Sequence, residues 1–175
     1  GGKGAAVISG LYVADNMNFT HAIQIDADGQ HDLAAVTDFL DQAHHNPQAL
    51  VCGYPIYDQT VPLSRLWGRE LTNFWVHVNT RSKALRDAMC GFRVYPLAQT
   101  LPVLPSVKTR RMDFDPDIVV RLIWAGVTVI NRPVHVTYPK DGISHFRGFS
   151  DNMRISRLHA GHFCTMLLRR MGLAK

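Results

Sequence analysis

Two aspartates that follow a short apolar run are the residues of this chain best suited to chemistry. Asp26 and Asp28 are separated by one residue, and residues 22–25 before them predict a buried strand. Two carboxylates at the carboxyl end of a strand can both turn into the crevice beyond it, where open α/β sheets bind ligands. Carboxylate oxygens suit Mg²⁺ or Mn²⁺ bridging a diphosphate. The pattern predicts a metal site, while the competing interpretation is a loop pair that caps the next helix.

Helical and extended patterns alternate along the chain, which predicts an α/β architecture that holds these aspartates at the end of a strand. Helices are expected over residues 4–14, 32–43, 64–78 and 114–125. Extended segments are expected over residues 21–25, 49–52, 92–95, 127–130 and 134–138. Asp32 is the expected N-cap of the second helix, with Leu33, Phe39 and Leu40 facing inward. The stretch 54–62 contains two prolines and is expected to be a loop.

Composition is typical of one globular domain, with 175 residues of which 46% are hydrophobic and 19% charged. Cys52, Cys90 and Cys164 lack the spacing of a disulfide framework or a metal site, so free thiols in a reducing, cytoplasmic compartment are expected. No apolar run reaches the roughly 18 residues needed to cross a bilayer.

The positive charge is concentrated near the end of the sequence. Residues 147–175 contain six of the 19 basic side chains but, in Asp151, one of the 14 acidic ones. Apolar residues recur there at helical spacing, which predicts an amphipathic helix over 149–175. Two interpretations stay open: a helix at an anionic membrane surface, or a terminal helix packed on the core with a solvated basic face. Nucleic-acid binding is not expected, because the basic residues lack interleaved aromatics.

Four segments in order resemble family-2 glycosyltransferases of the GT-A fold, within the branch of dolichyl-phosphate mannosyltransferase and related polyprenyl-phosphate glycosyltransferases. They are GGKGAAVISGL at 1–11, IDADGQHD at 25–32, DAMCGFRVYP at 87–96 and MDFDPDIVVRLIWAGVTVINRPV at 112–134. The resemblance implies a Rossmann-like mixed sheet flanked by helices over residues 1–148. Members of the family carry further strands before the Gly-Lys-Gly segment, so the chain is expected to lack the first strands of the nucleotide-binding half.

The resemblance also assigns a donor site. It implies that Asp26 contacts the ribose or the metal, that Asp28 coordinates the metal, and that Gln30 adds a further metal contact. Lys3 belongs to the first matching segment and is expected to bind the donor. Mg²⁺ or Mn²⁺ would bridge the two phosphates of a nucleotide-sugar and neutralise charge as the nucleoside diphosphate leaves.

On the acceptor side two chemistries stay open. A hydroxyl acceptor requires a general base in an inverting enzyme, and Asp87 is the first candidate, with Asp113 and Asp115 behind it. A lipid phosphate is already ionised at neutral pH and requires no base, so cationic side chains would hold it instead. The expected acceptor-binding residues are Arg65, Arg69, Arg93, Ser144 and Arg147.

These expectations combine into an inverting transferase that moves a hexose to a lipid-linked acceptor at the inner face of the cytoplasmic membrane. One alternative transfers the sugar to a hydroxyl of a glycan or a lipid, with Asp87 as the base. Another treats the chain as an inactive fragment that serves only as a binding or structural module.

Overall fold

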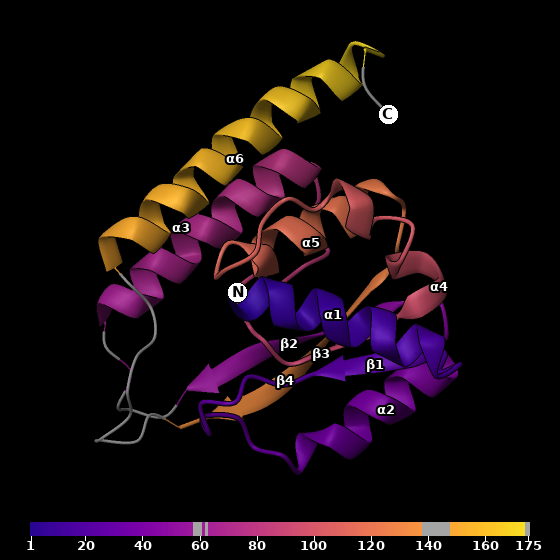
Figure 1. The fold of residues 1–175 in the computed structure, drawn as a ribbon. Helices are drawn as coiled ribbons and strands as arrows, with labels where there is room; N and C mark the ends of the chain where they lie inside the picture. Colours follow the sequence, from indigo (N-terminus) through magenta and orange to yellow (C-terminus); the bar gives the residue numbers. More distant parts are fainter. Residues whose placement is uncertain (58–60, 62, 138–147, 174–175) are drawn as a thin grey trace.

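Four strands form one mixed sheet between helices, in a computed structural model that describes residues 1–57, 61, 63–137 and 148–173 (Figure 1). The strands are β1 (His21–Gln24), β2 (Leu50–Tyr57), β3 (Arg93–Pro96) and β4 (Val129–Val136). Their spatial order is β1-β3-β2-β4, with β3 antiparallel to both neighbours and β2 parallel to β4. The expected α/β class with a mixed sheet is confirmed.

Helices cover both faces of this sheet. They are α1 (Lys3–Asn16), α2 (Ala35–His45), α3 (Leu63–Thr80), α4 (Leu97–Thr100), α5 (Phe114–Trp124) and α6 (Gly148–Arg170), with a 3₁₀ turn η1 (Leu104–Ser106). Helix α2 packs on one face, and α1 and α5 lie on the other. Helix α3 packs against α5, and α6 lies along α3 as the element farthest from the sheet (Figure 1).

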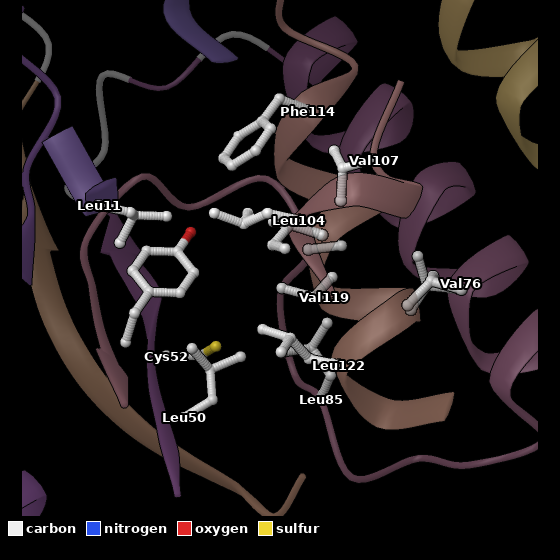
Figure 2. Packing of buried hydrophobic residues seen from close by; sticks show 14 of the residues in the cluster. Leu11, Leu50, Cys52, Val76, Leu85, Leu104, Val107, Phe114, Val119 and Leu122 are labelled. Carbon is white, nitrogen blue, oxygen red and sulfur yellow. The ribbon is translucent and has the colours of Figure 1, made fainter. Parts of the chain in front are cut away.

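Alternation along the strands divides the buried side chains into two clusters. In β2, Leu50 and Cys52 join the cluster under α1 and α5, whereas Val51 joins Phe39 of α2 on the opposite face. This follows from the two-residue repeat of a strand. Figure 2 shows the larger cluster, in which Phe114 and other side chains from the α5 region meet those of the sheet.

Strands β2 and β4 are longer than the sequence suggests. The expected loop at 54–62 is wrong over its first four residues, because β2 continues to Tyr57 and pairs residue by residue with β4. The two separate extended segments expected in the later region form one strand that runs through Pro133. Pro133 is tolerated because β4 is an edge strand, and Pro55 is tolerated because the pairing of β2 with β3 ends at Cys52.

The start of α2 also differs from expectation, because Asp32 is not its N-cap. The backbone N–H of Asp32 donates to the His135 carbonyl at 3.1 Å, which holds this residue against β4. Its Oδ1 accepts a bond from the backbone N–H of Ala34 at 2.9 Å, and the helix begins one residue later. Leu33 and Leu40, expected to face inward, are 63% and 47% exposed.

Helix α6 is attached to the body of the protein through two buried histidines. His162 Nε2 lies 2.9 Å from Asp117 Oδ1 in α5, and the ring of His159 stacks on Trp75 of α3 at 6.5 Å between centroids. Burial, with a smaller effect of His162, lowers the pKa of His159 to about 4. One face of this helix therefore packs on the core, as in the second of the two interpretations of the basic segment.

The buried His159 predicts a stability that depends on pH. Since its pKa is about 4 in the folded chain and about 6.5 when unfolded, the unfolded chain binds the proton first as pH falls. This contribution to folding is complete above pH 6.5 and is lost between about pH 6.5 and 4, by about 3 kcal/mol. Urea unfolding at several pH values should show this loss. His159→Gln should flatten it, the exposed His44→Gln should not, and equal slopes in both variants would contradict the prediction.

Candidate active site

Asp26 lies just beyond the carboxyl end of β1, against the turn that leads into β3. Its carboxylate occupies the position where a side chain at Gly91 would otherwise lie, so only glycine admits it there. The register of the sheet sets this contact, because Gln24 of β1 pairs directly with Arg93 of β3. The sequence Cys-Gly-Phe-Arg of the third matching segment thus has a physical role next to the first aspartate.

Lys3 connects Asp26 to a second carboxylate that is far away in the sequence. Its Nζ lies 2.7 Å from Asp26 Oδ2 and 2.5 Å from Oδ2 of Asp115, which stands in the first turn of α5. The three side chains come from the start of α1, the end of β1 and the start of α5. The structure therefore brings together two expected donor-site residues and one expected catalytic residue.

Close packing of α1 on the segment before α5 makes this contact possible. A Cβ at Gly4 would lie 2.5 Å from Cβ of Phe114, so the two backbones approach more closely than any larger residue allows. The backbone N–H of Ala5 donates to the Arg110 carbonyl at 3.1 Å, which satisfies one of the open donors in the first turn of α1. The Gly-Lys-Gly sequence places Lys3 at this crossing.

Asp115 rests on a buried polar network. Gln24 Nε2 donates to its Oδ1 at 3.1 Å, and Tyr95 Oη donates to Gln24 Oε1 at 2.9 Å. Arg93 Nη1 lies 3.5 Å from Oδ1 of Asp115 and donates to its backbone carbonyl at 3.0 Å, while Nη2 donates to the Ala88 carbonyl at 2.7 Å. Arg93, expected to bind the acceptor, is instead 0% exposed. Its contacts hold Asp115 in place from inside the protein.

Electrostatic interactions keep Lys3 and Asp115 charged. Burial would raise the pKa of Asp115, but Lys3 and then Arg93 lower it below its ordinary value. Burial likewise opposes charge on Lys3, and Asp115 together with Asp26 raises the pKa of this ammonium. Asp115 is therefore an ionised carboxylate that holds Lys3, an arrangement that suits electrostatic support better than proton abstraction.

Beyond the cluster, Asp28 is exposed in a tight turn. Gly29 adopts φ +70°, and Asp28 Oδ1 accepts the backbone N–H of Gln30 at 3.1 Å. The turn is anchored on the sheet side, because Thr137 N–H donates to the Gln30 carbonyl at 3.0 Å. The next residue, His31, has a buried Nδ1 that has no hydrogen-bond partner among the described residues. Burial lowers the pKa of His31 despite the nearby aspartates, so its ring is neutral at pH 7.

The oxygen atoms of this turn are of the kind that binds a divalent cation, but the described residues do not form a complete ion site. Asp26, Asp28 and Gln30 offer the hard oxygen atoms that Mg²⁺ or Mn²⁺ prefers. Within the described residues, no group of three or more His, Cys, Asp or Glu side chains could hold a metal ion. Such an incomplete set suits an ion that keeps water and takes ligands from substrate phosphates.

On the other side of Gly91, Asp87 anchors the turn that leads to β3. Its Oδ1 accepts bonds from Arg69 Nη1 at 2.7 Å and from the backbone N–H groups of Met89 and Cys90 at 2.8 and 2.7 Å. Arg69 also lies over the ring of Tyr57 at 5.8 Å. Asp87 is only 3% exposed. Its evident role is to fix the turn and the direction of Arg69.

Of the remaining expected residues, the structure describes the side chain of Asp113 alone. Asp113 accepts the backbone N–H of Arg111 at 3.1 Å, a local bond ahead of α5. Arg65 belongs to α3, but its side chain lies outside the described part of the chain, as do Ser144 and Arg147 entirely. Sequence reasoning missed Gln24; a polar residue within the apolar run before the aspartates was the available signal.

No family model matches the chain. The chain is 25% identical over 125 residues to a dolichyl-phosphate beta-glucosyltransferase of Dictyostelium discoideum, and the match covers 67% of this chain. The match spans 37% of the length of that relative. The chain is therefore similar to part of a glycosyltransferase.

We expect Asp115→Asn to destabilise the chain by about 3 kcal/mol, because it leaves the buried Arg93 and Lys3 without their shared counter-ion. Asp113→Asn is the matched control, since this carboxylate accepts one backbone bond near the surface and its loss should cost about 1 kcal/mol or less. Urea denaturation of both variants measures the difference. Equal losses would contradict a central role for Asp115.

Proposed function

We propose that this chain contributes the donor site of an inverting glycosyltransferase, which moves a hexose from a nucleotide-diphosphate sugar to a lipid-linked acceptor such as a polyprenyl phosphate. The observation that carries this proposal is the Lys3–Asp26–Asp115 cluster beside the exposed Asp28. The name of the Dictyostelium relative supports both the reaction class and a lipid-phosphate acceptor. Because the chain covers 37% of that relative, the activity proposed is that of the complete protein.

On the donor side, Asp26, Asp28 and Gln30 would hold Mg²⁺ or Mn²⁺, which when bound offsets the charge of the diphosphate leaving group. Lys3 fixes the orientation of Asp26 through its 2.7 Å contact, and Asp115 holds Lys3. The side chains are thus oriented before the donor binds, which lowers the cost of ordering them. His31 lies beside them as a neutral ring able to accept or donate a hydrogen bond.

On the acceptor side, the geometry of Asp87 favours a phosphate over a hydroxyl. Asp87 is nearly buried, and its Oδ1 already accepts three hydrogen bonds. A general base must come within hydrogen-bond reach of the proton that it removes. A phosphate oxygen needs no base: it attacks the anomeric carbon directly as the bond to the nucleoside diphosphate breaks. Arg69, with Arg65, Ser144 and Arg147, is proposed to hold that phosphate.

Calorimetric titration of the complete protein with UDP-sugars and GDP-sugars, with and without Mn²⁺, tests the donor site. We expect metal-dependent binding that Asp28→Ala weakens by about tenfold or more. Asp32→Ala is the matched control, because this exposed carboxylate accepts a bond from the backbone N–H of Ala34 and contributes nothing to the proposed ion site. A folded complete protein that binds no donor, or equal weakening in both variants, would contradict the proposal.

Asp87→Asn in the complete enzyme separates the two acceptor chemistries. With a phosphate acceptor we expect turnover to stay within about tenfold of the wild type, while KM for the acceptor rises because Arg69 loses its ion pair. A loss of turnover of about a thousandfold with donor binding intact would instead identify Asp87 as a general base for a hydroxyl acceptor. Steady-state kinetics with a short-chain polyprenyl phosphate and with its alcohol provides both readouts.

A further inference from the structure

A closed ring of buried polar side chains lies behind Asp115, on the protein side of the candidate active site. Arg93 and Tyr95 are two residues apart in β3 and share one face of the sheet, and Gln24 of β1 pairs directly with Arg93. The four members of the ring, Gln24, Arg93, Tyr95 and Asp115, are each 8% exposed or less. Polar groups buried this deeply are costly unless each finds a partner, so their hydrogen bonds determine how they lie.

The guanidinium of Arg93 sets the direction of the bonds in this ring, because it can donate but cannot accept. Its Nη1 lies 3.4 Å from Tyr95 Oη, which therefore accepts this bond and donates its own hydrogen to Gln24 Oε1 at 2.9 Å. With its carbonyl oxygen occupied in this way, the Gln24 amide directs Nε2 to Asp115 Oδ1 at 3.1 Å. Arg93 closes the ring, since its Nη1 also lies 3.5 Å from Asp115 Oδ1.

The ring leaves the second oxygen of Asp115 for Lys3. Oδ1 faces Gln24 and Arg93, whereas Oδ2 lies 2.5 Å from Lys3 Nζ, so the carboxylate cannot rotate without breaking the contacts of Oδ1. Of the three N–H groups of Lys3, one points to Asp115 and one to Asp26, and the third has no acceptor among the described residues. The Lys3 side chain is 18% exposed, so this third N–H is available to an oxygen of a bound donor.

We propose that Tyr95 and Gln24 are positioning residues for Lys3. Their hydrogen bonds fix the orientation of the Asp115 carboxylate, and this carboxylate holds the Lys3 ammonium between Asp26 and the place of the donor phosphates. Apolar side chains in place of both would fill the same space at little net cost in stability, because a buried hydrogen bond replaces contacts with water. What the phenol and the amide add is direction, which lowers the cost of ordering Lys3 when the donor binds. Only this last step rests on the proposed function.

Competitive acetylation of the complete protein, without donor or metal, tests the control of Lys3 by the ring. Mass spectrometry gives the rate at Lys3 relative to that at Lys83, which is exposed in the same molecule. In Tyr95→Phe and in Gln24→Met we expect the relative rate at Lys3 to rise at least about threefold, because the ammonium is held less firmly. The double variant should react no faster than Gln24→Met alone, since Tyr95 acts through Gln24.

Thr100→Val is the matched control for these variants. The Thr100 hydroxyl is buried and donates to the Pro96 carbonyl at 2.8 Å, at the end of β3 away from the site. Each single variant should lower the melting temperature by about 2 °C, but Thr100→Val should leave the rate at Lys3 unchanged. Unchanged Lys3 reactivity in Tyr95→Phe and Gln24→Met would overturn the inference, as would an equal rise in Thr100→Val.

Donor titration and steady-state kinetics of the complete protein then test what the positioning achieves. We expect Tyr95→Phe to weaken donor binding and to raise the donor KM by about threefold to tenfold, while kcat stays within about twofold of the wild type. In a Lys3→Met background Tyr95→Phe should cause no further loss, and an equal loss there would overturn the inference, because Tyr95 would not act through Lys3. A rise in Lys3 reactivity in a protein that binds no donor would leave the inference standing and contradict only the proposed function.

Discussion

The ammonium group of Lys3, shared between two carboxylates, is the interaction on which the rest of the site depends. It joins the start of α1, the end of β1 and the start of α5, three segments that are separated in the sequence. A carboxylate as buried as Asp115 is strongly unfavourable without compensating partners. Lys3, Arg93 and Gln24 supply those partners, so the site and the packing of the surrounding helices form together.

Two glycines make this arrangement sterically possible. Because Gly91 has no side chain, the carboxylate of Asp26 can lie against it, and because Gly4 has none, the backbone of α1 can approach Phe114. In both places a methyl group would push a charged side chain away from its partner. The glycines of the first and third matching segments therefore act through the same cluster, although they lie on different elements of the fold.

The sequence predicted the elements of this fold better than their interactions. Periodicity located α1, α3 and α5 to within two residues, because each places an apolar stripe on the core. It failed where tertiary pairing overrides local preference, as when β2 continues through Pro55 beside β4. The pattern of Asp26 and Asp28 indicated the end of β1. The support of Asp115 by Arg93 was not predictable, because a lone arginine is usually a surface residue and only the pairing of β1 with β3 brings it under the site.

Helix α3 shows how the two sides of one element can be constrained by different environments. Its inner side is fixed in rotation, because Asn73 Oδ1 accepts the backbone N–H of Ala88 at 2.9 Å and Arg69 pairs with Asp87. Since these contacts determine which residues face inward, they also determine that Trp67 and Leu71 face outward. The helix cannot turn to bury those side chains without breaking the contacts that hold the β3 turn and Gly91 beside Asp26. The exposure of Trp67 and Leu71 is therefore a consequence of the contacts that fix the inner side of the helix.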